Sequence, residues 1–419
     1  MKASPAPFSS YQKIAIALLS LTQFTVILDF MVISPLGDFL MKSMNLHPNQ
    51  FGVVVSVYAF SAGISGLLTA GFADRFDRKK LLLFFYSGFI AGTLFCGLSH
   101  SYIELLFARL ITGLFGGVIG SISLAIVADL FSIEQRGRAM GFIQMGFSAS
   151  QVLGIPIGIY LANLWGWESA FLMVAGIAII VAIIIMIKLQ PVTKHLTAQH
   201  DRSAFKHLYK TVAKRNYRIG FTATALLSVG GFMMMPFGSA FAINNLRISP
   251  HQLPLLFMVS GVASLIIMPL IGKLSDKVDK YKIFVIASVF MMIVVVAYTN
   301  LSAEPLWFVM IFNVLMMGGI FSRMIPATAL TTAIPDMEDR GAFMSINASL
   351  QQIAGGIAAA VAGSIVVQKT KFSPLENYSV LGYLTVLISC IAIFLLYRVS
   401  VMVKKKNTKP VEVLHEVAV

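Results

Sequence analysis

Two ionisable residues lie deep inside long apolar stretches of this sequence. Asp29 interrupts the stretch from Thr25 to Ile33, and Arg109 interrupts the stretch that follows Ala108. A carboxylate at the centre of a lipid-spanning helix costs about 2.5–3.5 kcal/mol on insertion scales, so it should face a partner or water. Burial favours the neutral acid, whereas a nearby cation favours the carboxylate. A carboxyl group that is alternately buried and placed beside a cation can therefore bind and release a proton.

Asp29 and Arg109 are expected to form a proton-coupling pair. At a helical rise of about 1.5 Å per residue, both lie in the outer half of the bilayer. Arginine keeps its proton inside proteins, so Arg109 would hold the Asp29 carboxylate and release the protonated acid. A fixed structural ion pair is the alternative interpretation.

Further polar residues inside the apolar stretches could face a substrate. Thr25 lies on the same helical face as Asp29, and Gln144 lies on the same face as Gln151. The predicted cavity-lining residues are Thr25, Gln144, Gln151, Asn313, Arg323, Asn347 and Gln351. For Gln144 and Gln151, ordinary polar packing in a kinked helix is the alternative.

Arg323 requires its own explanation. It lies about nine residues, or roughly 14 Å, from the end of its apolar stretch. A buried arginine needs an anion, and the apolar stretches of the second half contain no Asp or Glu. Contact with an acidic substrate and a structural or gating contact both remain open.

The composition indicates a chain whose main solvent is lipid. Of the 419 residues, 57% are hydrophobic and only 12% are charged, whereas about 25% are charged in a typical soluble domain. Apolar runs of roughly twenty residues cross a bilayer as helices. We predict an all-α integral membrane protein with twelve transmembrane helices, at 13–41, 50–73, 80–99, 103–130, 139–163, 168–189, 218–244, 252–274, 281–300, 305–332, 342–367 and 377–402.

Positive charge is distributed unevenly among the predicted loops. The net charge is +14, and the 32 Lys and Arg residues concentrate at both termini and in every second loop. The exceptions are Lys42, Arg247, Lys369 and Lys371 in the alternate loops and Arg109 and Arg323 inside helices. Loops rich in Lys and Arg stay in the cytoplasm. We expect both termini on the cytoplasmic side of a bacterial inner membrane, contact with lipid, and no nucleic-acid partner.

A charged cassette occurs twice, each time between two apolar stretches. Residues 71–80 read Gly-Phe-Ala-Asp-Arg-Phe-Asp-Arg-Lys-Lys, and residues 272–282 repeat the pattern in degraded form. A repeat at half the chain length indicates a duplicated membrane unit. We expect a six-helix bundle at 1–189, a cytoplasmic loop with a short amphipathic helix at 190–217, a second bundle at 218–403 and a polar tail at 404–419.

The cassette and the six-plus-six arrangement resemble the major facilitator superfamily. That family has the loop signature G-x-x-x-D-[RK]-x-G-[RK]-[RK], from which this chain departs because Asp77 and Asp279 replace a glycine. The resemblance implies transport by alternating access and a charge network that closes the cytoplasmic side. We refer to this network as the conformational latch, and its expected members are Asp74, Arg75, Arg78, Asp129, Arg136, Arg138 and Asp276.

Residues 146–158 resemble the G-P-x-x-G-G kink of the drug/proton antiporter branch of that superfamily. The glycines and Pro156 do not match its register fully. No nucleotide-binding or hydrolase motif occurs, so we expect neither an enzyme nor a cofactor or metal. The predicted function is proton-coupled efflux of small amphiphilic or apolar compounds such as drugs, metabolites or siderophores, by a monomer. A proton symporter importing a polar or anionic metabolite and a non-transporting membrane sensor or scaffold are the alternatives.

Overall fold

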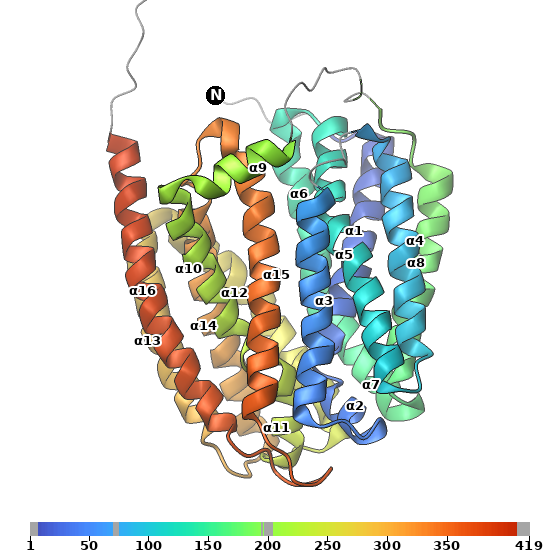
Figure 1. Ribbon diagram of the computed structural model, residues 1–419, viewed down its shortest axis with the longest axis vertical. Helices are drawn as coiled ribbons and strands as arrows, with labels where there is room; N and C mark the ends of the chain where they lie inside the picture. Colours follow the sequence, from blue (N-terminus) through green and yellow to red (C-terminus); the bar gives the residue numbers. More distant parts are fainter. Residues whose placement is uncertain (1–6, 70–74, 194–195, 197–203, 409–419) are drawn as a thin grey trace, which may run out of the picture.

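The computed structural model describes residues 7–69, 75–193, 196 and 204–408, without the side chains of 204–206, 407 and 408. Within these ranges, twelve helices are long and apolar enough to cross a membrane. Their arrangement confirms the predicted all-α transmembrane fold. Two groups of helices stand side by side, α1 to α8 in one and α10 to α16 in the other (Figure 1).

The first half contains six spans, one of them interrupted. Its helices are α1 (Ser10–Val32), α2 (Gly37–Ser43), α3 (Pro48–Thr69), α4 (Arg78–Gly97), α5 (Tyr102–Leu130), α6 (Ile133–Ala149), α7 (Ile155–Trp165) and α8 (Glu168–Lys188). A π-helical turn, Ser150–Gly154, joins α6 to α7. Together α6 and α7 make one span of 33 residues. The predicted kink therefore takes the form of a π-turn before Pro156.

A short surface helix, α9 (Ala204–Ala213), precedes the second half. The helices of that half are α10 (Arg215–Phe232), α11 (Gly238–Asn244), α12 (Leu253–Lys277), α13 (Lys280–Thr299), α14 (Leu306–Thr331), α15 (Arg340–Ile365) and α16 (Tyr378–Thr408). The helix expected between the two halves is α9. It lies across the end of the molecule that also holds the first described residues and the end of α16 (Figure 1).

One predicted boundary of a span is wrong. The first span was expected to reach residue 41, but α1 ends at Val32 and α2 is a separate short helix. Pro35 and Gly37 lie at this break, and neither favours a continuous helix. The first residues of the expected polar tail continue α16 to Thr408, and Lys404 and Lys406 form ion pairs with Asp279 and Asp336.

The two aspartates that depart from the loop signature cap helices. The Asp77 carboxylate accepts a hydrogen bond from the Lys79 amide at the start of α4. The Asp279 carboxylate accepts bonds from the Tyr281 and Lys282 amides at the start of α13. Both aspartates have negative φ angles, −55° and −54°, so no glycine is needed.

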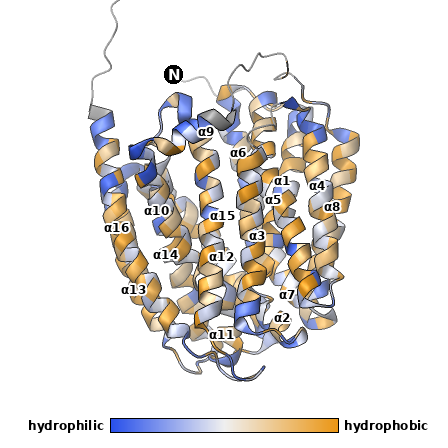
Figure 2. Cartoon of the chain, viewed as in Figure 1, coloured by the Kyte–Doolittle hydropathy of each residue, from blue (hydrophilic) through white to orange (hydrophobic). Residues whose placement is uncertain are grey.

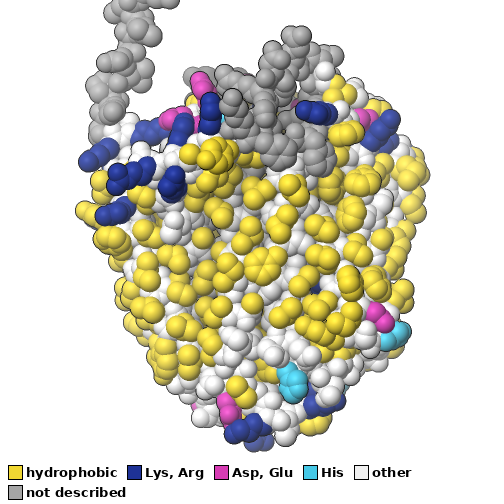
Figure 3. Space-filling view, viewed as in Figure 1, with side chains coloured by type: hydrophobic (Ala, Val, Ile, Leu, Met, Phe, Trp, Pro, Cys, Tyr) yellow, Lys and Arg dark blue, Asp and Glu magenta, His cyan; other side chains and the backbone are white. Residues whose placement is uncertain are grey.

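Apolar side chains surround the middle of the molecule, and charges gather at its ends (Figures 2 and 3). Large side chains such as Ile187 and Ile286 are each 70% exposed, as expected of a surface that faces lipid. Many Lys and Arg side chains lie at the end with α9 (Figure 3). We refer to this as the basic end and to the other as the opposite end.

Candidate functional site

Asp29 and Arg109 form an ion pair in the interior of the first half. Arg109 Nη1 donates to Asp29 Oδ2 at 2.9 Å, and neither side chain is exposed. The second carboxylate oxygen accepts a hydrogen bond from Thr93 Oγ1 at 3.0 Å. The helices α1, α4 and α5 thus each supply one group to a single buried cluster. Thr93 had no distinguishing signal in the sequence, because hydroxyl groups are common inside membrane helices.

Aromatic rings complete the surroundings of Arg109. Its guanidinium carbon lies 4.3 Å from the centroid of the Tyr58 ring and 6.0 Å from that of Phe171. Nε and Nη2 of Arg109 have no hydrogen-bond acceptor among the described residues. A single carboxylate therefore compensates this cation, assisted by ring faces. If Asp29 took up a proton, that compensation would be lost.

Small residues bring α5 close enough to its neighbours to bury the pair. A Cβ atom added to Gly113 would lie 2.0 Å from Ser61 Oγ of α3. One added to Gly92 of α4 would lie 2.6 Å from Thr112 Oγ1 of α5. Glycine at these positions is thus required by the close approach of α5 to both helices.

The structure places Thr25 beside this cluster, in the contact between α1 and α4. Its hydroxyl donates to the Thr22 carbonyl and lies 2.8 Å from the Tyr86 hydroxyl. Thr25 is fully buried, so in this conformation it presents no surface to a substrate.

Gln144 and Gln151 lie on α6 and the π-turn, on the side that meets α12 of the other half. The backbone of Gln151 packs against Gly261 of α12, and its buried Oε1 has no donor among the described residues. Gln144, two turns nearer the basic end, is exposed. The contact between the halves therefore includes Gln151 and leaves Gln144 accessible.

The predicted substrate residues of the second half lie on α14 and α15. Asn313 donates to the Val309 carbonyl of its own helix. Arg323 is 8% exposed and lies over the Phe284 ring at 5.8 Å. Asn347 is buried, and Gln351, one turn further along α15, is half-buried. Arg323 and Asn347 thus belong to the interior of the second half.

Part of the predicted latch is assembled at the basic end. Arg78 Nε and Asp129 Oδ2 form an ion pair at 3.3 Å. Arg136 donates to the carbonyls of Ala128 and Phe131 at the end of α5, and Arg138 stacks on the Phe8 ring at 3.9 Å. Arg75 and Asp276 are exposed, and Asp74 lies outside the described residues. These contacts all lie within the first half.

Contacts at the opposite end join the two halves, and the sequence did not predict them. Ser34 donates to the Met235 carbonyl, and Ser239 donates to the Ser34 carbonyl at 2.9 Å. Asp38 accepts a bond from Asn244 at 2.6 Å and pairs with Lys42 at 2.7 Å. We refer to these six residues as the outer contact: Ser34, Asp38, Lys42, Met235, Ser239 and Asn244.

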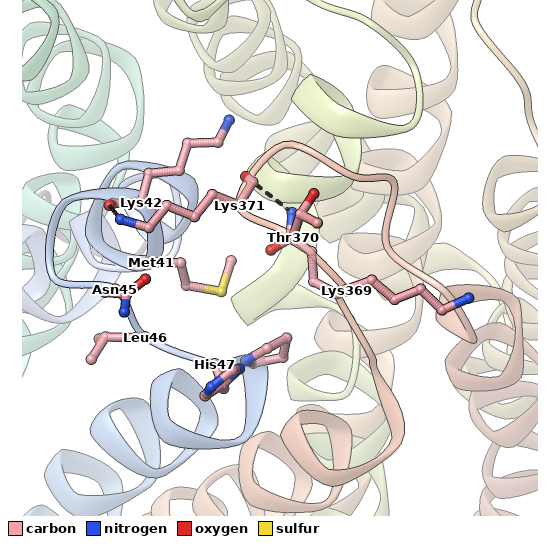
Figure 4. Close-up of a pocket in the computed structure, with 10 residues that line it drawn as sticks. Met41, Lys42, Asn45, Leu46, His47, Lys369, Thr370 and Lys371 are labelled. Atoms are coloured by element: carbon pink, nitrogen blue, oxygen red, sulfur yellow. Dashed lines mark hydrogen bonds between the residues drawn. The ribbon is translucent and has the colours of Figure 1, made fainter.

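Asp38 is the titratable group at the centre of the outer contact. Burial raises the pKa of its carboxyl above the usual value, against the opposing effects of Lys42 and Asn244. Lys371 of the second half also donates to the Lys42 carbonyl at 3.1 Å. Both halves contribute to the adjoining pocket of about 300 Å³, with Lys42 and His47 on one side and Lys369 and Lys371 on the other (Figure 4).

Close backbone packing extends this closure along α3 and α15. A Cβ atom added to Gly52 of α3 would lie 2.7 Å from the Ala359 carbonyl oxygen of α15. Ser56 donates to the Gly356 carbonyl at 2.8 Å. At the basic end, by contrast, the ion pairs Lys214–Asp339 and Lys406–Asp336 both lie within the second half. The polar contacts between halves described above are thus concentrated at the opposite end.

Comparison with known proteins agrees with this architecture. A family model described as the Major Facilitator Superfamily matches residues 19–242 and 220–418. A "Probable sugar efflux transporter" of Helicobacter acinonychis (strain Sheeba) is 26% identical over 276 residues, 65% of this chain and 69% of that protein. "Multidrug resistance protein 2" of Bacillus subtilis (strain 168) is 24% identical over 277 residues, 64% of this chain and 68% of the relative.

Solved structures share the fold at low sequence identity. A bacterial homolog of the human lysosomal transporter Spinster, in an inward-facing and unoccupied conformation, has a TM-score of 0.76 and 16% identity. The similarity covers 96% of this chain and all of that chain. A D-xylose-proton symporter has a TM-score of 0.73 and 17% identity, covering 91% of this chain and 97% of the other.

Proposed function

Because this chain belongs to the Major Facilitator Superfamily of alternating-access transporters, we propose that it exchanges protons for a small organic molecule and exports that molecule. The observation that carries the proposal is the buried Asp29–Arg109 pair. An integral membrane protein has little structural reason to keep a carboxylate in the interior of a span, and a transporter can use it to carry a proton.

The exchange follows from the competition between Arg109 and a proton for Asp29. When Asp29 is ionised, the pair with Arg109 and the Thr93 bond hold α1, α4 and α5 together. A proton arriving from outside neutralises Asp29 and leaves Arg109 uncompensated in a buried site. The first half then has a different preferred packing, which is the two-state behaviour that coupling requires.

The direction of transport is inferred from the relatives. Two of them carry the names sugar efflux transporter and multidrug resistance protein. We propose that the substrate is a small amphiphilic or apolar compound, and that small sugars are worth including in a substrate screen.

Orientation follows from the charge distribution. We propose that the basic end faces the cytoplasm, as the excess of Lys and Arg there favours. The opposite end, closed by the outer contact, then faces outward. In the complementary state, the latch residues Arg78 and Asp129 would help to close the basic end.

A proton symporter that imports an anionic metabolite is the second candidate. The observation favouring it is Arg323, a buried cation with no ion-pair partner among the described residues. The two candidates predict opposite directions of substrate movement for the same proton gradient.

Everted membrane vesicles distinguish the two functions. With an acidic interior, protons leave the vesicle, so an antiporter accumulates substrate inside and a symporter does not. A panel of hydrophobic cations, hydrophobic anions and small sugars supplies the probes. We expect accumulation by the wild type and by Glu338→Gln, an exposed control, and none by Asp29→Asn. Uptake that requires an alkaline interior would establish import instead.

A further inference from the structure

The buried apolar side chains of the second half form two separate clusters. The cluster at the basic end includes Phe284, Phe343 and Leu396. The other cluster includes Met291 and Leu381 and continues into the core of the first half. A helical bundle of this kind normally has one contiguous core, so the interruption needs an explanation.

Polar side chains occupy the interval between the two clusters. Five helices each contribute one, and every one of them carries a buried nitrogen or oxygen atom that lacks a hydrogen-bond partner among the described residues. They are Thr224 of α10, Ser288 of α13, Arg323 of α14, Asn347 of α15 and Ser389 of α16. All five side chains are more than nine-tenths buried. We refer to them as the polar layer.

Contacts between neighbouring helices place Thr224 and Asn347 at one height. Gly220 of α10 packs against Phe343 of α15. Lys214 and Asp339, which precede the two helices, form an ion pair, so α10 and α15 run in the same direction. Thr224 and Asn347 each lie one turn after the contact of Gly220 with Phe343, on the same faces. The two side chains therefore face each other across α10 and α15.

The same reasoning places Ser288 near Ser389. Met292 Sδ of α13 lies 3.8 Å from Cys390 Sγ of α16. The start of α13 pairs with the end of α16, so the helices are antiparallel. Ser288 lies one turn from the Met292 contact toward the basic end and Ser389 one residue toward the opposite end, a separation of roughly 7.5 Å along the helix axes.

Arg323 lies at this height as well. Its guanidinium is over the Phe284 ring of α13, and Gly319, one turn earlier on α14, packs against Met291. Ser288 lies midway between Phe284 and Met291 along α13. The Arg323 head group is therefore level with Ser288.

The hydroxyl groups of the polar layer behave differently from others in the same half. Ser260, Thr331 and Thr385 each donate to the carbonyl four residues earlier in their own helix. Thr224, Ser288 and Ser389 make no such bond. Since local bonding is the usual way for a helix to satisfy a buried hydroxyl, these three donors are available to something else.

The unpartnered atoms of the polar layer are Nε of Arg323, three hydroxyl groups and the Asn347 Oδ1 acceptor. A cation close to free hydroxyl donors is the chemistry of an anion site. Arg323 stays protonated, and it has no ion pair or hydrogen bond among the described residues. Leaving such a charge uncompensated in the protein interior is costly. In the first half, Asp29 compensates Arg109. The second half has no carboxylate in the polar layer, so its counter-ion must come from solution.

We propose that the polar layer binds one small monovalent anion of the halide class, held by Arg323 with the hydroxyls of Ser288, Ser389 and Thr224. Each of the five residues is 8% exposed or less, which favours a small anion over a large organic acid. The bound anion joins the two apolar clusters of the second half and stabilises that bundle. The proposal does not depend on the direction of transport.

Thermal unfolding of the purified full-length protein in detergent tests the proposal. Chloride or bromide replaces gluconate at constant ionic strength, and the unfolding midpoint is measured at each halide concentration. We expect a saturable rise of the wild-type midpoint, because a ligand that binds the folded state stabilises it. Arg323→Met should show no rise, and it should exceed the wild type in halide-free buffer.

Three further variants make the result specific. Arg398 is exposed and also stacks on a phenylalanine ring, at 5.2 Å from Phe394, so Arg398→Met should keep the wild-type halide response. The double variant Ser288→Ala, Ser389→Ala should require about tenfold more halide. Asp29→Asn should keep the response, which separates this site from the proton site.

Two results would overturn the anion site. One is a wild-type midpoint that is independent of halide, which would leave only water in the polar layer. The other is a halide response that persists in Arg323→Met. If Arg323→Met fails to fold, the serine double variant decides the question, because an unchanged halide midpoint in that protein contradicts the proposed ligands.

Discussion

At the scale of single residues, the chemistry depends on one carboxyl group and the partners that three helices bring to it. Asp29 is held by Arg109 at 2.9 Å and by Thr93 at 3.0 Å, with no exposure to solvent. Burial makes each charge of the pair costly. The attraction between Asp29 and Arg109 offsets that cost only while both groups are charged. This balance makes the cluster sensitive to a single proton.

The first prediction concerns the stability of that pair. Arg109→Met leaves Asp29 as an unpaired buried acid and should lower the free energy of unfolding by about 3–5 kcal/mol. The double variant Asp29→Asn, Arg109→Met should recover most of this loss, because no buried charge remains. Thermal unfolding of the purified variants measures both effects. Additive losses in the double variant would show that the two residues act independently.

Asp29 and Arg109 were predictable because an isolated charge in an apolar stretch has few explanations. Thr93 and Tyr58 were not, since threonine and tyrosine are unremarkable in membrane helices and only the packing of α4 and α3 brings them to the pair. For Thr25, the sequence predicted the position of the residue but not what its hydroxyl group contacts. Its helical face was correctly predicted, but its hydroxyl is occupied by Thr22 and Tyr86.

At the scale of helices, the duplicated cassette has a structural role at each helix start. Asp77 and Asp279 cap α4 and α13 in the same way. Asp279 also pairs with Lys404 at 2.7 Å, which joins α13 to the end of α16. The hydrogen bond from Lys404, with those from the Lys282 and Tyr281 amides, lowers the pKa of Asp279.

The second prediction follows from these caps. Asp77→Ala and Asp279→Ala should each cost about 1 kcal/mol of stability at neutral pH, a typical value for a lost N-cap. Because the pKa of Asp279 is lowered in the folded protein, its contribution is present above the ordinary value of 3.8 and disappears as the pH falls below it. The difference between wild type and Asp279→Ala should therefore shrink in acid. A difference that grows in acid would contradict this assignment.

The third prediction concerns the contact between α3 and α15. Gly52→Val would place side-chain atoms against the Ala359 carbonyl, so the helices must separate. We expect a loss of about 1–3 kcal/mol, as for other overpacked sites, measured by thermal unfolding. Gly176→Val is the matched control, since nothing lies within 4 Å of an added Cβ there. Equal effects of the two substitutions would show that α3 and α15 tolerate a gap.

Hydrophobicity predicted the positions of most helices, but it did not predict every break within a span. The kink near Pro156 was expected, whereas its π-helical form depends on how α6 and α7 pack against α1 and α12. The end of α1 at Val32 was missed, because the apolar stretch continues through the turn into α2.

At the scale of the whole molecule, the two halves meet through contacts between residues about 200 positions apart in the chain. Ser34 with Met235, and Asp38 with Asn244, are examples. Because these contacts join residues so far apart in the chain, no local pattern in the sequence marks them. The repeat predicts that two halves exist, and only the structure shows which end is closed.

The fourth prediction is a pH effect on this closure. Burial raises the pKa of Asp38 while the outer contact is closed, so the closed state binds a proton more tightly than an open state in which Asp38 is solvated. Lowering the pH toward the ordinary value of 3.8 should favour closure, and raising it through the raised pKa should remove that preference. Asp38→Asn should abolish the dependence.

Spin labels at His100→Cys and Ser302→Cys, in a background with Cys96 and Cys390 replaced by serine, report the distance between the halves at this end. A shorter mean distance at lower pH agrees with the prediction. A pH response that persists in Asp38→Asn would assign the effect to another group.

The central claim is that Asp29 gains and loses a proton, and infrared difference spectroscopy during a pH titration tests it most directly. A protonated carboxyl group in an apolar site gives a C=O stretching band distinct from that of a carboxylate. We predict that such a band appears on acidification of the wild type and of the exposed control Glu338→Gln, and is absent from Asp29→Asn. A difference spectrum that is the same in wild type and Asp29→Asn would contradict the account.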